Sequence, residues 1–564
     1  MIIRKIVAMA ALILVGASAA TASSNDLGPS DRDLLSTYAR DTWHSIDAMA
    51  SRGELPTDEL RRQGDSWTQS ELTSPTNIAA YLWSVIAAED LHIISREDAG
   101  RRIERTLQSL GRVERSHGFF FNWYDAASGR RARVWPGGAA LRPFLSSVDN
   151  GWLAVALIVV GNAKPELRGA TDALLEPMNF GFFYDPYDPN DPIAHPGLLR
   201  GGYFIDDNTF TSFHYGTLNT EPRIASYVAM ARGQVPVEHY YRMIRARNLG
   251  PDGRPAMART YVGISVVEGN RSYRGLNFVP TWDGTMFEAL MVPLFVPESE
   301  WAPASWGANH SLYVRAQIEY GLRDARLGYW GISASTDPGG GYRAYGVAEL
   351  GSRDPDTSRR HEGIITPHAT FLALPYRPVE AVANLRTLVE NFPLYGPYGF
   401  YDSVDVHTGQ VSERVLILDQ GMIMASLSNV IGGDVLRRGF STGSIESVVR
   451  PLIAPERFET GEDLYQSPEQ AVAGSERSSF LAPDLRIDTP GVVPPAPVHV
   501  KIPETISISS PVRDMEVSPL FGLSSTIADL LRDVGPHQPL IGPSSNSERK
   551  GRRKQATPPG SAPP

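Results

Sequence analysis

The chain has 564 residues, of which 42% are hydrophobic, and 53 basic against 63 acidic side chains give a formal net charge of −10. This balance argues against a nucleic-acid-binding protein, because such binding rests on neutralising phosphate charges. The sequence contains no cysteine, which excludes disulfides and thiol-ligated metal centres, so stability must come from the packing of a large core.

The first 22 residues have the pattern of a cleavable signal peptide. Arg4 and Lys5 form a short positive region, residues 6–15 are apolar, and two small-x-small sites follow within residues 17–22. The apolar run is shorter than the ~20 residues that a membrane-spanning helix needs. We therefore expect a periplasmic or secreted protein without stable membrane insertion. An uncleaved membrane anchor is the alternative.

Apolar residues at helical spacing predict a succession of helices along most of the chain. The third of these helices opens on Ser95 with Asp98 three residues later, which resembles a capping box. The expected ranges are 31–51, 76–91, 95–115, 147–161, 166–175, 223–231, 237–247, 286–292, 308–322, 367–374, 378–391, 420–429 and 444–452.

Long, aromatic and glycine-rich segments separate some of these helices, and long loops in a compact domain usually carry function. They cover residues 117–143, 181–220, 259–285, 328–363 and 393–414, and the last contains a stretch that could form short turns or strands. Alternating short and long links favour an all-α fold, an (α/α)6 barrel or toroid with long loops forming a cleft at one end. An irregular helical bundle is the alternative, and periodicity alone does not separate the two.

The domain organisation follows from a change in composition. We expect one monomeric catalytic domain over residues 23–465. From residue 466 to residue 564, Pro, Ser and Gly dominate and predict a largely disordered tail. The basic run 549–554 could contact an anionic surface or could simply be solvated.

Five acids lie in aromatic, glycine-rich or apolar sequence, where a charge has little structural reason to be. Cleavage of a glycosidic bond needs one acid to protonate the leaving oxygen and a base or nucleophile on the anomeric side, both usually Asp or Glu. The five candidates are Asp149, Glu221, Glu288, Asp402 and Asp419.

Several of these acids also have a structural interpretation. Asp149 could be an N-cap or a first-turn acid of the helix that follows it, and Glu221 could be a first-turn acid with Arg223 as its partner. Asp419 could cap a helix or line the floor of the cleft. Glu288 lies in an apolar stretch, so it needs a partner, a water molecule or a catalytic task.

Sugar binding also needs aromatic platforms, because sugar rings present apolar faces. The residues expected to contact substrate, besides Asp402 and Asp419, are Trp123, Tyr124, Trp282, Asp283, Tyr398 and Phe400.

We expect no metal and no cofactor. His310, His361 and His368 show no zinc-type spacing, and satisfied structural histidines are the simpler interpretation. The sequence has no convincing nucleophile elbow, P-loop or dinucleotide fingerprint. The acidic loop 185–191 lacks the spacing of an EF-hand, so we interpret it as a turn-rich loop rather than a calcium site.

Seven segments occur in the order expected for the glycoamylase-like family, which the chain resembles over roughly residues 31–453. That family includes endo-β-1,2-glucanases and the central domain of cyclic β-1,2-glucan synthases. The segments are 74–81 (SPTNIAAY), 122–125 (NWYD), 147–151 (SVDNG), 221–225 (EPRIA), 285–291 (TMFEALM), 398–401 (YGFY) and 419–421 (DQG).

The resemblance implies an (α/α)6 barrel with a central acidic cleft and action on a β-linked glucan, with β-1,2-glucan as the leading candidate. It implies that Glu221 is the general acid and that Asp149 is an essential acid on the base side. In retaining transglycosylase relatives, Glu221 would be the acid/base and Glu288 the nucleophile. Asp402 matches an acid near the reducing side of the cleft.

The leading hypothesis is therefore an exported, endo-acting glycoside hydrolase in which Glu221 works with Asp149 or Glu288. A carboxyl separation of ~5 Å predicts retention of configuration, and ~6.5–9.5 Å predicts inversion. The alternatives are a transglycosylase or polysaccharide lyase on the same scaffold, and a non-catalytic glycan-binding envelope protein. The last is favoured if the three acids pair with arginines or cap helices. The enzyme hypothesis requires that they meet in one pocket wide enough for a sugar.

Overall fold

A computed structural model describes residues 26–51, 53, 55–246, 257–352 and 363–462. The predicted signal peptide, His361 and the predicted tail from residue 466 lie outside the described residues. The predictions made for them, the domain boundaries and the monomeric state stay predictions.

The described chain is rich in helices, as predicted. Most lie within two or three residues of the expected ranges. The third and seventh, α4 and α8, each end five residues early, and α8 does so because Met243 is extended. The α-helices are α2 (Pro29–Met49), α3 (Pro75–Asp90), α4 (Arg96–Leu110), α5 (Ser147–Ala163), α6 (Arg168–Leu175), α7 (Arg223–Ala231), α8 (Glu238–Arg242), α9 (Met286–Leu290), α10 (Glu298–Trp301), α11 (Ala308–Glu319), α12 (Pro367–Ala373), α13 (Pro378–Asn391), α14 (Ile417–Ile431), α15 (Val435–Phe440) and α16 (Ser444–Ile453).

Short antiparallel strands lie between the helices, so the prediction of an all-α fold needs correction. Extended backbone in the long loops leaves N–H and C=O groups that pair locally. The strands are β1 (Glu59–Gln63), β2 (Ser66–Gln69), β3 (Leu72–Thr73), β4 (Arg115–Ser116), β5 (Phe119–Phe120), β6 (Tyr124–Asp125), β7 (Phe144–Ser146), β8 (Tyr184–Asp185), β9 (Leu198–Leu199), β10 (Gly202–Phe204), β11 (Thr209–Phe210), β12 (Met257–Tyr261), β13 (Ile264–Glu268), β14 (Arg271–Tyr273), β15 (Leu276–Phe278), β16 (Ser335–Thr336), β17 (Tyr342–Arg343), β18 (Ile364–Ile365), β19 (Tyr395–Gly396), β20 (Gly399–Phe400), β21 (Val404–Asp405), β22 (Arg414–Leu416) and β23 (Gly461–Glu462).

The hairpin β19–β20 confirms the short strands that the sequence suggested near residue 395. Tyr395 pairs with Phe400 and Gly396 with Gly399. Gly399 has a φ of 77°, which side chains rarely adopt, and the backbone of Thr42 would lie 3.2 Å from an added Cβ. Glycine is therefore needed both for the turn and for its close approach to α2.

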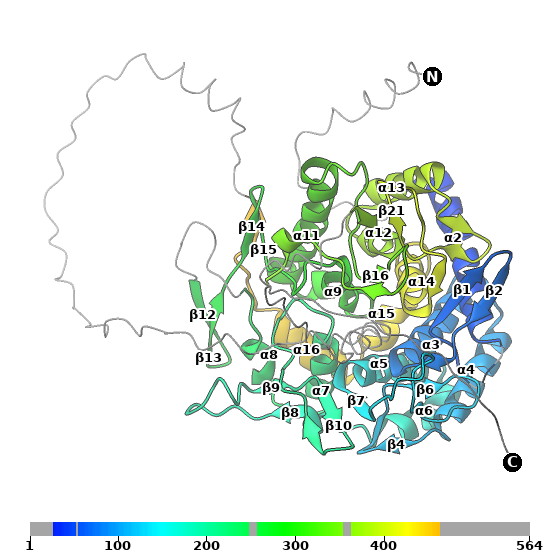
Figure 1. Cartoon of the computed structure of the whole chain (residues 1–564). Coiled ribbons are helices and arrows are strands. Elements are labelled where there is room, and N and C mark those ends of the chain that lie inside the picture. The colour runs from blue at the N-terminus through cyan, green and yellow to red at the C-terminus, as the bar shows by residue number, and fades with distance from the viewer. Residues whose placement is uncertain (1–25, 52, 54, 247–256, 353–362, 463–564) are drawn as a thin grey trace, which may run out of the picture.

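Neighbouring helices follow one another around a closed path. Helix α3 packs on α5 and α14, α5 packs on α7, and α12 packs on both α9 and α14. Arg223 joins α7 to α9, because its guanidinium donates to the carbonyls of Glu288 and Ala289. In Figure 1 the chain colour runs around the molecule until α14 lies beside α2 and α3, as their packing contacts also show. This arrangement is consistent with an α/α toroid.

The hydrophobic core lies where these neighbouring helices pack together, and α5 is an example. Its sequence is apolar on nearly every face, which is typical of a helix buried all round. Trp152 of α5 contacts Trp83 of α3 and Phe295 edge-on or tilted, with ring centroids 6.0 and 5.6 Å away. Trp152 therefore belongs to the hydrophobic core.

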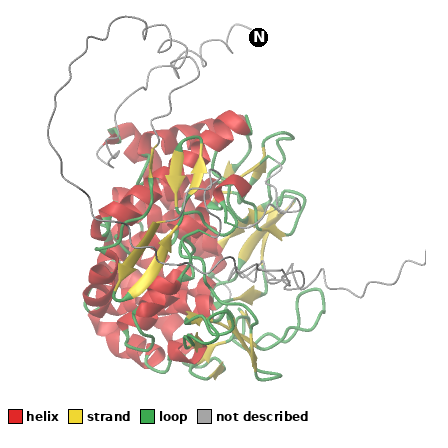
Figure 2. Ribbon diagram, turned by 90° about the vertical axis from the view of Figure 1, so that its left-hand side faces the viewer, coloured by secondary structure: helices red, strands yellow, loops and turns green. Residues whose placement is uncertain are grey.

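Four of these helices begin at, or one residue after, the end of a short strand, which places their first turns beside the long loops. The successive pairs are β3 and α3, β7 and α5, β18 and α12, and β22 and α14. Their partners are loop strands: β3 pairs with β6, β7 with β10, β18 with β21 and β22 with β1. Figure 2 shows the helices massed on the left and loops with several short strands extending to the right.

Within the described residues, no helix has both the length and the apolar character needed to cross a membrane.

Candidate active site

Asp149 lies in the first turn of α5, and its side chain reaches across to α3. Ser146 caps α5 by accepting from the backbone N–H of Asp149 at 3.2 Å, so the cap is Ser146 and not the acid. The hydroxyl of Thr76, at the start of α3, donates to Asp149 Oδ1 at 2.5 Å. Burial raises the pKa of Asp149 to about 6, while the Ser146 and Thr76 hydrogen bonds act to lower it.

A second donor approaches Asp149 from the loop after β5. With its amide nitrogen facing the carboxylate, Asn122 donates to Asp149 Oδ2 at 2.9 Å, and its oxygen accepts from the indole N–H of Trp123 at 3.2 Å. Two neutral donors on opposite oxygens favour the charged form of a buried carboxylate. Asp149 is therefore held in place by two other segments of the chain.

Glu221 immediately precedes α7, and its carboxyl is buried without compensation. The residue is 1% exposed, and both carboxyl oxygens lack a hydrogen-bond partner among the described residues. Burial raises the pKa of Glu221 to about 8, and the charges of Asp149 and Asp283 act in the same direction. At neutral pH this carboxyl therefore carries a proton.

Arg223 is not the partner of Glu221, contrary to the interpretation offered from the sequence. Its guanidinium forms a two-pronged ion pair with Glu298 on α10, with both N–O distances at 2.9 Å. His310 and Tyr227 also bind the Glu298 carboxylate, each at 2.9 Å. Burial raises the pKa of Glu298, but Arg223 outweighs this effect and the pKa falls to about 2. Helix α10 was not predicted, so the sequence did not reveal this pair.

Glu288 closes a capping box at the start of α9. The side chain of Thr285 accepts from the backbone N–H of Glu288, and Glu288 Oε2 accepts from the backbone N–H of Thr285. The backbone N–H of Asp283 also donates to Oε2, at 3.0 Å. Burial raises the pKa of Glu288 well above its usual range, and the charges of Asp283 and Glu221 add to the effect. Glu288 therefore caps a helix, and a capping role for these acids favours the alternative of a non-catalytic glycan-binding protein.

The three acids share one electrostatic neighbourhood although 139 positions separate the first from the last (288 − 149). Asp149 raises the pKa of Glu221, and Glu221 raises the pKa of Glu288. Helices α5 and α7 approach closely one turn further on, where a Cβ on Gly151 would lie 2.7 Å from the Cβ of Ala225. Tertiary packing therefore brings the predicted catalytic residues together.

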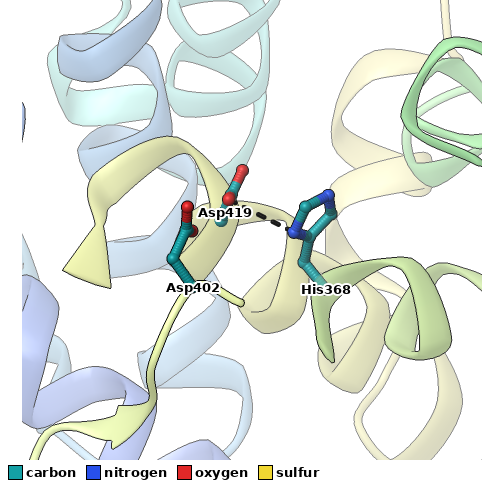
Figure 3. Close-up of side chains that lie close together, drawn as sticks. All are labelled: His368, Asp402 and Asp419. Carbon is teal, nitrogen blue, oxygen red and sulfur yellow. Dashed lines mark ion pairs between the residues drawn. The ribbon is translucent and has the colours of Figure 1, made fainter. Parts of the chain in front are cut away.

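A second cluster combines Asp402 and Asp419 with His368 (Figure 3). Burial raises the pKa of Asp419 to about 7 and the pKa of Asp402 well above its usual range, where the nearby Asp419 adds to the rise. His368 Nδ1 lies 3.2 Å from Asp419 Oδ2, and burial lowers the pKa of His368 to about 4. A histidine and two carboxylates could hold a cation, which the sequence spacing did not indicate.

The aromatic residues expected to hold sugar rings lie in different environments. Tyr124 and Phe400 are completely buried in the main core, and the Tyr124 hydroxyl donates to the carbonyl of Glu114. Trp282 is nearly buried. Trp123 packs edge-on against Trp135, with ring centroids 5.3 Å apart, in a small separate cluster.

Tyr398 is only half-buried and contacts Trp67 on β2, with ring centroids 4.9 Å apart. Trp67 in turn stacks on Tyr401 at 5.7 Å. The sequence predicted Tyr398 as a substrate contact but not Trp67, because Trp67 lies in a polar strand far from the acidic segments.

The loop 185–191 is turn-rich, as interpreted, and its buried acid is already neutralised. Asp185 binds His195, His214 and Arg200 through its two oxygens, at 2.8 to 2.9 Å. The permanent charge of Arg200 beside Asp185 disfavours calcium there, whereas burial lowers the pKa of His214.

The acids are nearly sealed: Asp149, Glu221 and Glu288 are 0%, 1% and 2% exposed. A cavity of about 580 Å³ lies elsewhere and none of the three lines it; its lining includes Glu298, Ser299, Tyr376, Arg377, Arg437 and Glu462. That the three acids share one pocket wide enough for a sugar therefore stays a prediction, because a sugar can reach Glu221 only if the groups covering its carboxyl move aside.

Comparison with known proteins confirms the resemblance found in the sequence. The model of the family described as "Glycoamylase: Putative glucoamylase" matches residues 249–441, which contain Glu288, Asp402 and Asp419. The chain is 24% identical, over an alignment of 599 residues, to the cyclic β-(1,2)-glucan synthase NdvB of Rhizobium meliloti (strain 1021). That match covers 80% of this chain, which spans only 19% of the relative's length.

Two solved structures have the same fold. A "putative glucoamylase" from Bacteroides caccae has a TM-score of 0.57 and 17% identity, and the match covers 77% of this chain and 100% of that one. An endo-β-1,2-glucanase from Chitinophaga pinensis, solved with sophorotriose and glucose, has a TM-score of 0.52 and 16% identity, over 76% and 98% of the two chains. At these identities the likeness establishes the fold.

Proposed function

We propose that this chain is a glycoside hydrolase that cleaves a β-linked glucan, with β-1,2-glucan as the substrate and internal bonds as the point of attack. We place the reaction in an (α/α)6 toroid with Glu221 as the general acid. The observation that carries the proposal is the buried, uncompensated carboxyl of Glu221 among three other acids. Perturbed carboxyls of this kind cluster at functional sites.

Glu221 suits the acid role because it is protonated when the substrate arrives. A general acid must keep its proton near neutral pH and release it to the leaving oxygen in the transition state. A pKa of about 8 meets the first condition. Its own backbone N–H and the charge of Arg223 act to lower the pKa, but burial outweighs both, and no side chain among the described residues binds the carboxyl oxygens.

We assign the second acid to Asp149 rather than Glu288. A base or nucleophile must be ionised, and the donors Thr76 and Asn122 favour the charged form of Asp149, whose pKa is about 6. The pKa of Glu288 is held well above its usual range, and its oxygens already accept from the capping box. Burial and the charges of Asp283 and Glu221 favour the neutral form of Glu288, so we assign no proton-transfer step to it.

The likenesses support this choice of reaction. The endo-β-1,2-glucanase from Chitinophaga pinensis and the synthase NdvB are both described by their action on β-1,2-glucans. The helical fold that the chain shares with the first provides the scaffold, and the acids described above provide the chemistry.

One observation favours a transglycosylase as the second candidate. The relative NdvB is a synthase of cyclic glucans, and its sequence match covers 80% of this chain. In a transglycosylase a sugar hydroxyl replaces water as the acceptor, so longer or cyclic products form.

The deciding experiment is product analysis on a panel of linear β-1,2-, β-1,3-, β-1,4- and β-1,6-glucans. The proposal expects short oligosaccharides from β-1,2-glucan alone, with chain length falling before free glucose accumulates. Longer or cyclic products would favour the transglycosylase. An ultraviolet-absorbing unsaturated sugar would identify a lyase, and binding without any new product would identify a glycan-binding protein.

A further inference from the structure

The proposed reaction gives no proton-transfer step to His368, Asp402 or Asp419, although the last two were predicted to contact substrate. His368 lies in the first turn of α12, Asp419 in the first turn of α14, and Asp402 in the short link between β20 and β21 (Figure 3). One ligand atom from each residue lies within 4.8 Å of the others, and all three residues are at most 2% exposed.

Several polar atoms of this cluster have no hydrogen-bond partner outside it among the described residues: Asp402 Oδ1, Asp419 Oδ2 and both ring nitrogens of His368. Within the cluster, Asp402 and Asp419 lie close enough to share a proton, and His368 Nδ1 lies 3.2 Å from Asp419 Oδ2. No lysine or arginine in the described part of the chain forms an ion pair with either carboxylate. Two buried carboxylates side by side need a proton or a cation between them, because their charges otherwise repel in a medium of low polarity.

A neighbouring segment of the same chain orients the carboxylate of Asp402. The backbone N–H and the hydroxyl of Thr336 both donate to Asp402 Oδ2, the hydroxyl at 2.7 Å. The same hydroxyl contacts Ser412 Oγ at 2.6 Å. Oδ2 is thereby occupied, and Oδ1 is left for the cluster. Outer hydrogen bonds that fix a ligand in this way are typical of metal sites.

We propose that His368, Asp402 and Asp419 bind a first-row divalent cation of the Mn²⁺ or Zn²⁺ type. One imidazole nitrogen with two carboxylate oxygens suits these ions, whereas calcium takes oxygen ligands only. Bonds of about 2.0–2.2 Å place the ligand atoms of a tetrahedral site about 3.4 Å apart, so a pair of ligand atoms at the upper limit of 4.8 Å would have to close by more than about 1 Å.

A cation at this place would join three segments of the fold that are far apart in sequence. It would bond α12, α14 and the β20–β21 link, and it would offset the mutual repulsion of the two carboxylates. Because it binds the folded arrangement, it should stabilise the protein in proportion to the logarithm of its free concentration. This stabilisation is independent of whether the chain cleaves a glucan.

The test uses the full chain, freed of metal by a chelator and then titrated with MnCl₂. Binding is followed by the loss of the electron paramagnetic resonance signal of free aqueous Mn²⁺, and stability by the midpoint of thermal unfolding. We expect one equivalent to bind, the midpoint to rise with Mn²⁺ concentration, and ZnCl₂ to displace Mn²⁺. A wild-type chain that binds no Mn²⁺ and no Zn²⁺ overturns the proposal and identifies the cluster as a carboxyl pair that shares a proton.

Variants locate the site. Asp402→Asn and Asp419→Asn keep the side-chain shape and should abolish binding, and Thr336→Val should weaken it by about 10- to 100-fold through loss of the orienting hydroxyl. The matched control is His195→Ala, which removes a more exposed histidine bound to Asp185 and should bind as the wild type does. Should an Asn variant fail to fold, Thr336→Val decides: unchanged affinity contradicts the site, as does loss of binding in His195→Ala.

Discussion

The hydroxyl of Thr76 on α3 lies 2.5 Å from Asp149 Oδ1 on α5 and donates a hydrogen bond to it. This contact joins the first turns of two neighbouring helices and helps to set the charge of a carboxylate beside Glu221. The pKa of Asp149 therefore depends on how α3 and α5 pack together.

Removing this contact should move the pH dependence of catalysis. In Thr76→Val the carboxylate loses a donor that favours its charged form, so the pKa of Asp149 rises above about 6. Because the proposed reaction needs ionised Asp149, the acidic limb of the kcat/KM profile should shift to higher pH. Thr387→Val, at an exposed position of α13, is the control and should leave the profile in place. An unshifted acidic limb in Thr76→Val would separate Asp149 from the rate-determining chemistry.

Replacing Glu221 with glutamine should remove the proton donor without disturbing the fold. General acid catalysis contributes about 10²- to 10⁴-fold, so kcat on the active glucan should fall by that amount. The circular dichroism spectrum should not change, because glutamine has nearly the same shape as a protonated glutamate. Glu380→Gln on the exposed side of α13 is the matched control. Activity of Glu221→Gln equal to that of the control would refute the assignment.

The same variant should alter how stability depends on pH. The folded pKa of Glu221 is about 8 and its ordinary value is 4.5, so the folded chain holds the proton more tightly than the unfolded chain. The resulting stability is fully present below pH 4.5 and is lost as the pH rises toward 8. A shift of this size corresponds to roughly 5 kcal/mol.

Denaturant unfolding of wild type and Glu221→Gln between pH 4 and pH 9 measures this effect. The two free energies of unfolding should be similar at pH 4, and the variant should become the more stable protein as the pH rises through 8. Parallel curves for the two proteins would show that Glu221 is solvated or compensated in solution.

The close approach of α5 and α7 should make Gly151 intolerant of a side chain. An added Cβ would lie 2.7 Å from the Cβ of Ala225 and 3.1 Å from its Cα. Gly151→Ala should therefore destabilise the protein by about 1–3 kcal/mol and lower activity, because the helices that carry Asp149 and Glu221 have to separate.

Gly169→Ala in α6 is the control for helical glycine, because nothing lies within 4 Å of its added Cβ. It should be neutral or stabilising by about 0.4–1 kcal/mol. Equal unfolding midpoints for the two variants would mean that α5 and α7 do not meet as closely as described.

Some features could be predicted from the sequence because they depend on residues within one or two turns of each other. Helices α7 and α13 have the expected bounds, since the apolar spacing and the proline at each start are local signals. Ser95 caps α4 as expected. The capping box of Thr285 and Glu288 has the same kind of local signature, Thr-x-x-Glu, and is therefore a feature that the sequence alone can predict.

The sequence by itself thus determined a helix-rich chain with acids at the starts of its helices. The order of seven short segments along the chain also indicated the resemblance to the glycoamylase-like family. Only the tertiary structure decided what those acids do. Arg223 pairs with Glu298 on an unpredicted helix, so no side chain among the described residues binds the carboxyl oxygens of Glu221. The fold also brings His368, Asp402 and Asp419 together across 51 positions (419 − 368). The physical reason is that burial and charge neighbours, which set the pKa of a carboxyl, come from helix packing between distant segments, whereas helical periodicity is contained in each segment.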